Sequence, residues 1–243
     1  MNRIAVVTGA TRGIGFTISK KLSEQGFFVV GLSRTLSSET QESWVNSLSN
    51  DCMLYKCNVA NIEDVEKFIA ELQLLDGTVE LLVNNAGITR DGVFHKMSTD
   101  EWKNVIDTNL NSLFYITQPI YKMMKDKRSG KIINISSVNG QKGQAGQVNY
   151  SSSKAGVHGF TMALAQEGAR NNILVNTVSP GYTNTEMMKG IRPDVLQDIK
   201  NNIPLARLAE PEEIANVVAF LADSNCSYIT GANIPVNGGL FIG

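Results

Sequence analysis

Residues 8–15 read Thr-Gly-Ala-Thr-Arg-Gly-Ile-Gly and stand between a short apolar run and a helical pattern. A glycine-rich turn in this position can bring backbone N–H groups and the positive end of a helix dipole against a phosphate. We expect Gly9 to permit a tight turn, Gly13 to let the backbone approach the phosphate, and Gly15 to allow close helix–strand packing. The spacing is G-x-x-x-G-x-G rather than G-x-G-x-x-G, so a plain glycine-rich connection is the alternative. The context favours a dinucleotide site.

Short apolar runs alternate with longer helical patterns along the whole chain. The runs that predict strands are Ile4–Thr8, Phe27–Leu32, Met53–Cys57, Leu81–Asn84, Lys131–Ser136, Leu174–Ser179 and Asn233–Val236. The patterns that predict helices are Gly13–Gln25, Glu63–Leu75, Asp100–Lys125, Asn149–Arg170 and Pro211–Ala222. Strands that are apolar throughout are typical of a parallel sheet covered by helices. The sequence therefore predicts a single α/β domain over residues 1–243, a doubly wound, Rossmann-like parallel sheet flanked by helices.

One stretch, Gly181–Ala209, does not fit this alternation and is too long for an ordinary connection. Because it follows the C-terminal end of a predicted strand, we expect a substrate lid over residues 181–209. Met187 and Met188 would give it an adaptable apolar surface. A fixed surface excursion is the alternative. A second stretch, Val138–Asn149, is polar and rich in glycine, and we expect a loop outside the core that lines the entrance to the site.

Composition argues against several classes of protein. The 243 residues carry a net charge of −1, and no Lys/Arg cluster suggests a nucleic-acid or membrane partner. The cysteines, Cys52, Cys57 and Cys226, are odd in number and form no CxxC pair, so we expect neither a metal site nor a disulfide framework. His95 and His158 show no ligand or nucleophile–base spacing. We expect no signal peptide, no membrane span of about 18 apolar residues, and a cytoplasmic location with reduced thiols.

The end of the second predicted strand bears on the choice of dinucleotide. A Rossmann site usually carries an acidic residue there, which binds the ribose 2′-hydroxyl. This chain has Gly31-Leu32-Ser33-Arg34 and no acid. Arg34 offers a planar fork suited to a phosphate, and Arg12 is a second candidate. The pattern favours NADP(H) over NAD(H), and a solvated loop charge is the alternative for Arg34.

Tyr150 and Lys154 are spaced i and i+4, so they share one face of a predicted helix. An ammonium near a phenol favours the phenolate, and we expect it to lower the pKa of Tyr150 from about 10. Such a tyrosine can exchange a proton with a substrate oxygen near neutral pH. The spacing alone is weak, because Tyr121 and Lys125 match it as well.

Context separates the two pairs. Thirteen residues before Tyr150 lies Ser137, at the end of a predicted strand. Thirteen residues before Tyr121 lies Thr108, inside a predicted helix. Ser137 could hydrogen-bond the same carbonyl oxygen that Tyr150 would protonate, and Ser136 is the competing neighbour. We expect Tyr121 to be a half-buried amphipathic side chain.

Several amides and turns complete the set. Asn109 lies in the apolar stripe of the predicted helix Asp100–Lys125, and a buried helical asparagine needs partners or water. A satisfied structural amide is the alternative reading of Asn109. Asn84–Gly87 and Pro180-Gly181 close strands at the sheet edge where ligands bind in such folds.

Taken in order, these motifs resemble the short-chain dehydrogenase/reductase family. The resemblance covers the whole chain and rests on Thr8–Gly15, Asn84–Gly87, Asn109, Ser137, Tyr150-x-x-x-Lys154, Pro180-Gly181, Thr230-Gly231 and Asn237-Gly238-Gly239. It implies that Tyr150 is the general acid in reduction and that Ser137 orients the carbonyl group. It further implies that Lys154 binds the nicotinamide ribose and tunes Tyr150, and that Asn109 holds a proton-relay water. The cofactor would supply the hydride, and the protein would supply orientation and a proton.

The resemblance also implies which residues contact the cofactor, NADPH or NADP⁺. They are Gly9, Thr11, Arg12, Gly13, Ile14, Gly15, Arg34, Asn58, Val59, Asn85, Ala86, Gly87, Tyr150, Lys154, Pro180 and Gly181. Asn58 stands where the family more often has an aspartate near the adenine.

Four patches, residues 87–97, 134–144, 175–182 and 237–240, are similar to the NADPH-dependent acetoacetyl-CoA reductases of bacterial polyhydroxyalkanoate synthesis. This resemblance implies reduction of acetoacetyl-CoA to 3-hydroxybutyryl-CoA, in the R configuration. The substrate contacts that it implies are Asp91, Gln144, Gln147 and Tyr182. Ala145 replaces an aromatic residue common there, which predicts a smaller or looser acyl-contact surface. A 3-oxoacyl-[acyl-carrier-protein] reductase is the alternative, and a non-catalytic NADP-binding regulator is a remote one.

Family resemblance further implies a homotetramer. The two long predicted helices carry apolar residues on more than one face, namely Phe114, Tyr115, Ile120, Phe160, Met162 and Leu164. The C-terminal Leu240-Phe241-Ile242 is also apolar. Apolar surface beyond the core stripe of a helix often pairs with another subunit.

Overall fold

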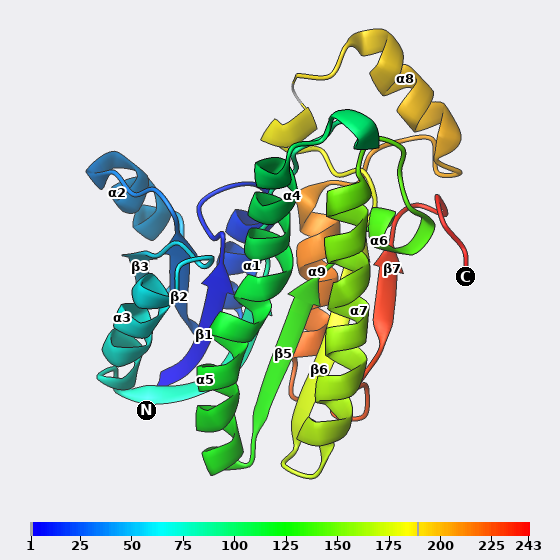
Figure 1. The fold of residues 1–243 in the computed structure, drawn as a ribbon. Helices are drawn as coiled ribbons and strands as arrows, with labels where there is room; N and C mark the ends of the chain where they lie inside the picture. Colours follow the sequence, from blue (N-terminus) through cyan, green and yellow to red (C-terminus); the bar gives the residue numbers. More distant parts are fainter. Residues whose placement is uncertain (1, 189) are drawn as a thin grey trace.

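The computed structural model of the protein describes residues 2–188 and 190–243, with the side chain of Met187 outside the described part. The described strands form one seven-stranded parallel sheet in the order β3-β2-β1-β4-β5-β6-β7 (Figure 1). They are β1 (Asn2–Thr8), β2 (Phe28–Ser33), β3 (Cys52–Lys56), β4 (Gly77–Asn84), β5 (Gly130–Ile135), β6 (Ile173–Pro180) and β7 (Asn233–Val236). The predicted doubly wound α/β fold is confirmed.

The central strand β1 shows why the sheet is buried on both faces. Its side chains alternate between two separate cores, with Ala5 and Val7 in one and Ile4 and Val6 in the other. Successive residues of a strand point to opposite faces, so a strand that is apolar at every position must be covered twice. The sheet therefore forms the middle layer of three.

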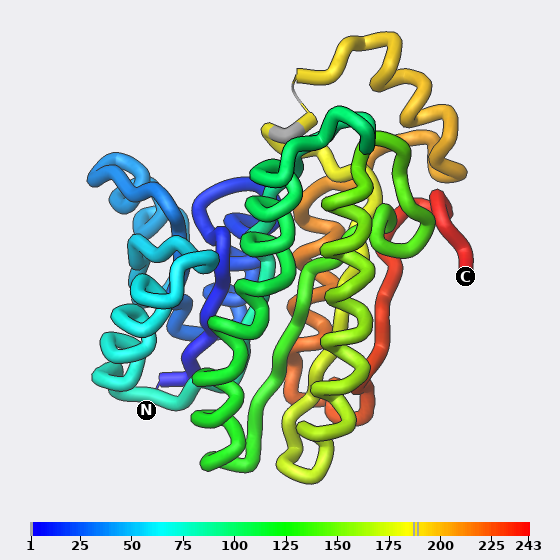
Figure 2. Tube along the Cα trace, in the orientation of Figure 1, coloured from blue at the N-terminus to red at the C-terminus, as the bar shows by residue number. Residues whose placement is uncertain are grey.

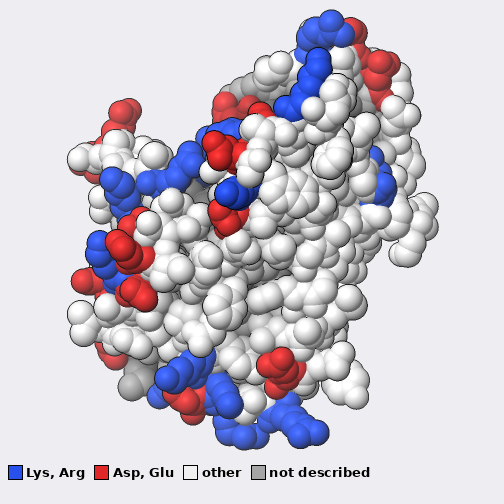
Figure 3. Space-filling view, in the orientation of Figure 1, with Lys and Arg blue, Asp and Glu red and all other residues white. Residues whose placement is uncertain are grey.

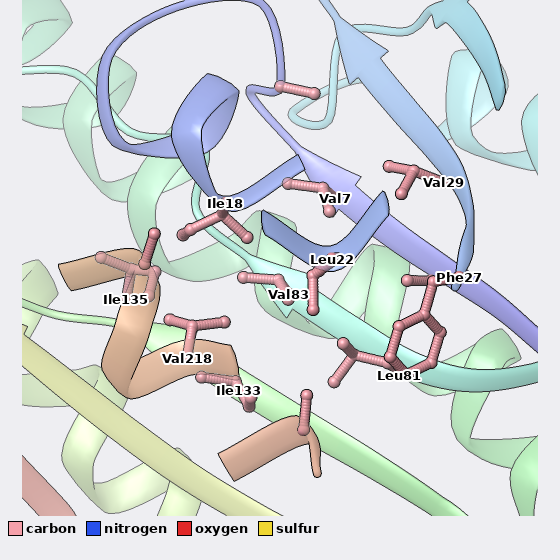
Figure 4. Packing of buried hydrophobic residues seen from close by; sticks show 14 of the residues in the cluster. Val7, Ile18, Leu22, Phe27, Val29, Leu81, Val83, Ile133, Ile135 and Val218 are labelled. Carbon is pink, nitrogen blue, oxygen red and sulfur yellow. The ribbon is translucent and has the colours of Figure 1, made fainter. Parts of the chain in front are cut away.

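Helices supply the outer two layers. They are α1 (Gly13–Glu24), α3 (Ile62–Gln73), α5 (Ser112–Lys127), α7 (Val148–Ala169) and α9 (Pro211–Ala222). Figure 4 shows the first core, where Ile18 and Leu22 of α1 and Val218 of α9 pack on the sheet. The second core lies under α3, α5 and α7. In the described part of the chain, no helix combines the length and apolar character needed to cross a bilayer.

Two helical features differ from the prediction. The predicted helix Asp100–Lys125 is interrupted, because α4 (Thr99–Ile106) runs into a π-helical segment, Asp107–Asn111, before α5 begins. The prediction also omits α2 (Ser38–Asn46), which buries Trp44 alone and so has no apolar periodicity.

The stretch Val138–Asn149 lies mostly outside the core, as we expected, although it is not a loop throughout. It contains a short helix, α6 (Asn139–Lys142), and both Val138 and Asn149 are buried. The expectation rested on polar composition. Composition could not indicate the buried positions, Asn139 and Asn149, whose side chains find hydrogen-bond partners inside the protein. That the stretch lines the entrance to the site stays a prediction.

The excursion Gly181–Ala209 stands beyond the sheet edge at which the strands end (Figure 2). Its two ends are joined by a parallel bridge between Thr183 and Ala209 and by a hydrogen bond from the Asn184 amide to the Ala209 carbonyl. Between them lies α8 (Pro193–Asn202), which is described throughout and buries no side chain. The excursion is therefore fastened at its base, while its outer helix packs little against the body.

Candidate active site

The glycine turn lies where β1 passes into α1, beside the point at which the strand order reverses. β1 pairs with β2 on one side and with β4 on the other, and ligands bind at such switch points. Gly9 has φ +65°, a conformation that favours glycine, and a Cβ on Gly15 would collide with the Gly9 carbonyl oxygen. The expected tight turn and close helix–strand packing are both present.

The N-terminus of α1 is suited to an anion. Its N-cap residue, Arg12, is extended, and no described side chain caps the first turn by a hydrogen bond. By contrast, Ser37, Asn61 and Ser98 cap α2, α3 and α4 through their side chains. The first turn of α1 also carries no acidic residue. Free N–H groups and an unopposed helix dipole make this terminus suited to bind a phosphate.

The end of β4 is bonded to the end of β1. The Asn85 side-chain amide donates to the Thr8 carbonyl at 2.9 Å, and Thr8 Oγ1 accepts from the backbone N–H groups of Asn85 and Ala86. Asn84 is buried and donates to Thr117 and Asn134. These contacts hold the two strand ends together, so Asn84 and Asn85 have structural roles that the sequence did not indicate.

Two exposed arginines stand at the same edge. Arg34 directly follows β2, and Arg12 precedes α1. A hydrogen bond between Thr11 Oγ1 and Ser33 Oγ, 3.1 Å long, brings the two strand ends close together. Asn58 is half-buried after β3, where its backbone N–H donates to Asp64. The sequence-predicted residues for the adenosine end of a dinucleotide therefore lie at neighbouring strand ends.

Ser137, Tyr150 and Lys154 meet between β5 and α7. The Ser137 hydroxyl is hydrogen bonded to the Tyr150 phenol. Lys154 Nζ lies 5.7 Å from the centre of the Tyr150 ring and donates to the Ile135 carbonyl at 2.8 Å. Ser136, the competing serine, donates instead to the Lys154 carbonyl at 2.8 Å and so fastens α7 to β5. The structure thus selects Ser137 as the serine that accompanies Tyr150.

The electrostatics of this group differ from the expectation. Burial raises the pKa of Tyr150, the hydrogen bond from Ser137 lowers it in part, and the Asp91 charge raises it further. Burial also lowers the pKa of Lys154 to about 8. The expectation that Lys154 lowers the pKa of Tyr150 is wrong for this structure, because burial raises that pKa and the Ser137 hydrogen bond offsets it only in part, so the phenol is held in its protonated form. A protonated phenol is the form that a general acid requires.

Asn109 is fully buried in the π-helical segment and is a satisfied structural amide. Its Oδ1 accepts from the Ile88 backbone N–H at 2.8 Å, and its Nδ2 donates to the Ile88 carbonyl at 2.9 Å and to Ser153 Oγ at 3.2 Å. These bonds lock the turn after β4 against α7. Its side chain therefore positions the site, and the proton-relay role that the resemblance implies for Asn109 stays a prediction.

The residues implied as substrate contacts fall into one polar group and two outliers. Gln147 Nε2 donates to Asp91 Oδ2 at 2.8 Å. Gln144 accepts from Lys142 Nζ at 2.9 Å. Tyr182 is half-buried, and burial followed by the Asp91 charge raises its pKa. The Asp91 charge therefore acts on both Tyr150 and Tyr182.

Residues expected to lie outside the chemistry do so. His95 is exposed, and His158 Nε2 makes a 3.3 Å hydrogen bond with Ser179 Oγ. Tyr121 packs against the second core as a half-buried side chain. Sequence reasoning missed Asn139, which is buried and contacts both Ser137 and Gln147. The available signal was an asparagine two residues after the candidate serine and directly before a glycine.

The comparisons with known proteins agree with this geometry. The model of a family described as enoyl-(acyl carrier protein) reductase matches residues 9–241. The chain belongs to the short-chain dehydrogenase/reductase family. Within this family, the chain is 49% identical to an acetoacetyl-CoA reductase of Cupriavidus necator over 244 residues, 99% of each chain. It is 47% identical to one of Acinetobacter sp. (99% of this chain, 98% of the relative).

A relative with another name also matches. The chain is 41% identical to a 3-oxoacyl-[acyl-carrier-protein] reductase of Vibrio harveyi, over 99% of this chain and 98% of that one. Family membership makes the protein an oxidoreductase that uses a nicotinamide cofactor. The uncapped N-terminus of α1 and the tight turn at Gly9 fit the diphosphate of such a cofactor.

Proposed function

We propose that the protein is an NADPH-dependent reductase of acetoacetyl-CoA. The observation that carries the proposal is the hydrogen-bonded Ser137–Tyr150 pair beside Lys154, at the same sheet edge as the glycine turn. The choice of substrate rests on the full-length similarity to acetoacetyl-CoA reductases. The product would be 3-hydroxybutyryl-CoA, in the R configuration implied by the resemblance.

The residues divide the reaction between them. The bound cofactor supplies a hydride, which forms the new C–H bond at the ketone carbon and delivers the electron pair. Ser137 donates a hydrogen bond to the ketone oxygen and holds it beside Tyr150. Tyr150 then gives its proton to that oxygen, which becomes the hydroxyl group. Lys154, held by the Ile135 carbonyl, stabilises the phenolate that remains and would bind the nicotinamide ribose.

NADPH is the proposed form of the cofactor because of charge at the adenosine end. The sequence has no acid at the end of β2 to bind a free 2′-hydroxyl, and Arg34 is exposed at that point. A guanidinium forms charge-assisted hydrogen bonds with a phosphate. Arg34 is therefore the proposed partner of the 2′-phosphate, and Arg12 is the second candidate.

Asp91, Gln147 and Tyr182 are the proposed contacts of the thioester end of the substrate. The Asp91 charge raises the pKa of both Tyr150 and Tyr182, and Gln147 donates to the Asp91 carboxylate, which supports a shared role for these side chains. Replacing Gln147 by Ala should raise the KM for acetoacetyl-CoA and leave the KM for NADPH unchanged.

We further propose that residues 181–209 close over the substrate as a lid, hinged where Thr183 meets Ala209.

A homotetramer is the proposed assembly. Phe114 on α5 is 60% exposed and Met162 on α7 is 53% exposed, whereas Ile120, which we expected on this surface, is buried in the core. Figure 3 shows that the surface over α5 and α7 carries few charges in its central part. An uncharged face with large exposed apolar residues is suited to a second copy of the chain. Static light scattering at micromolar concentration tests this, and a monomer would contradict it.

The second candidate function is reduction of a carrier-protein thioester, which the relative from Vibrio harveyi favours. The comparison of kcat/KM for acetoacetyl-CoA and for acetoacetyl-carrier protein separates the two. The first proposal requires a higher value for the CoA thioester. A higher value for the carrier protein would replace it by the second.

A further inference from the structure

Asn139 connects the two ends of the proposed substrate site. Its backbone N–H donates to Ser137 Oγ at 3.1 Å, and its side-chain Nδ2 donates to Gln147 Oε1 at 2.9 Å. Gln147 Nε2 in turn donates to Asp91 Oδ2 at 2.8 Å. A backbone hydrogen bond of 2.8 Å from Gly92 to Gly146 keeps the two loops of this chain in register.

The Asp91 carboxylate fixes the direction of the two side-chain hydrogen bonds that Gln147 makes. An ionised carboxylate only accepts hydrogen bonds, so Gln147 must turn its NH₂ group toward Asp91. The Gln147 oxygen then faces Asn139, so the Asn139 side chain must donate a hydrogen bond from its own NH₂ group. One hydrogen of Gln147 Nε2 is used on Asp91, and the second remains for another acceptor. The amide orientation of Gln147 is therefore that of a hydrogen-bond donor.

In this arrangement the side-chain oxygen of Asn139 is left without a hydrogen-bond donor among the described residues. Asn139 is 7% exposed, and its buried Oδ1 accepts no hydrogen bond from any residue that the structure describes. Asn109, by contrast, satisfies both ends of its amide. A buried asparagine whose only role is structural is normally satisfied at both ends. The unsatisfied oxygen of Asn139 points to a role that fixes its Nδ2 on Gln147.

We propose that Asn139 is a positioning residue for the 3-oxoacyl thioester. The inference rests on the proposed function. Such a substrate carries two carbonyl oxygens, one on the ketone and one on the thioester. Ser137, supported by the Asn139 backbone, receives the ketone oxygen, and Gln147, oriented by the Asn139 side chain, donates to the thioester oxygen. One short helix thus sets the distance between the two recognition points, which selects for a 3-oxo group over an isolated ketone.

The test uses a change that keeps the shape of the side chain. In Asn139→Asp, the donor to Gln147 becomes an acceptor, so Gln147 stands between two carboxylates and its single NH₂ group can no longer satisfy both sides. We expect the KM for acetoacetyl-CoA to rise at least about 10-fold while the KM for NADPH stays within about twofold. Asn139→Ser, which removes the long donor without adding charge, should raise the same KM.

A matched control lies on the same helix. Gln141 also has a buried oxygen without a partner among the described residues, and Gln141→Glu makes the same amide-to-carboxylate change without touching Gln147. Both KM values should stay within about twofold of wild type. The proposal is overturned if Asn139→Asp leaves the KM for acetoacetyl-CoA unchanged, if Gln141→Glu raises it equally, or if both KM values of Asn139→Asp rise together.

A second readout does not depend on turnover. The side-chain amide protons of Gln147, identified by their loss in Gln147→Glu, should shift in the ¹H–¹⁵N spectrum of Asn139→Asp and stay unchanged in Gln141→Glu. A wild-type protein that fails to reduce acetoacetyl-CoA with NADPH contradicts the proposed function. Identical Gln147 amide shifts in wild type and Asn139→Asp contradict the positioning role itself.

Discussion

Replacement of Lys154 by Met should stabilise the protein at neutral pH while abolishing its activity. Lys154 is 4% exposed, and burial lowers its pKa from 10.5 to about 8. At about 1.4 kcal/mol per pH unit, the buried ammonium costs about 3 kcal/mol of folding free energy at pH 7. Loss of the hydrogen bond to the Ile135 carbonyl destabilises the variant by about 1 kcal/mol and so reduces this gain. The variant should therefore be more stable by about 2 kcal/mol.

The stability gained by Lys154→Met should decrease as the pH rises. A lysine whose pKa is lower in the folded than in the unfolded state destabilises the fold fully below pH about 8, and the cost disappears as the pH approaches 10.5. Wild-type stability should therefore rise through this window, and the advantage of Lys154→Met should shrink to about zero near pH 10. Urea unfolding of the cofactor-free protein at pH 7 and pH 10, at one protein concentration, measures both values.

Lys131 provides the matched control. Its pKa is also lowered by burial, but its Nζ donates to the carbonyls of Leu221, Asp223 and Cys226 at the end of α9. Lys131→Met should destabilise the protein at pH 7 by about 1–3 kcal/mol, because three carbonyls lose their donor. If Lys154→Met is less stable than wild type at pH 7, or if its advantage is the same at pH 10, the reasoning about the buried ammonium is refuted.

Three further predictions concern the reaction. Tyr150→Phe should lower turnover by about 100-fold or more with NADPH affinity unchanged, since it removes only the proton; near-normal turnover would return attention to Tyr121. Arg34→Asp should weaken NADPH binding by about 10–150-fold and spare NADH, because a charge-assisted hydrogen bond to the 2′-phosphate is lost. Equal loss for both dinucleotides would make Arg12 the phosphate partner. Hydrogen exchange across residues 182–205 should slow when NADPH and acetoacetyl-CoA bind together, and equal protection with and without them would discard the lid.

The sequence predicts the sheet well because its strands are buried on both faces. In a chain with repeated βα units, an apolar run such as that of β1 indicates a strand covered by helices on both faces of the sheet. Elements without an apolar face leave no such signal. This is why α2, which buries Trp44 alone, and α8, which buries no side chain in its described length, escape prediction. The π-helical segment also escapes, because it is only five residues long and the chain remains helical on both sides of it.

For the candidate site, the sequence predicts which residues meet but not their energetics. The strand-end and helix positions of Ser137 and Tyr150 follow from chain order alone, and the structure brings them together. The direction of the Tyr150 pKa does not follow, because it depends on burial, which spacing cannot reveal. Asn139 was missed for a similar reason, since its importance lies in two hydrogen bonds made across a loop.

The bridge between Thr183 and Ala209 joins the two ends of the segment between them, so this segment leaves the domain and returns to it at one place. The free-energy cost of closing a flexible loop grows only slowly with its length, so the outer part of the segment, α8, which buries no side chain, can be exchanged at little cost to the domain, whereas Ile203 and Leu208 are buried. The sheet, the glycine turn and the Ser137–Tyr150 pair lie outside this segment. A change of acyl substrate can therefore arise here by insertion or deletion, without any alteration in the residues that move the proton.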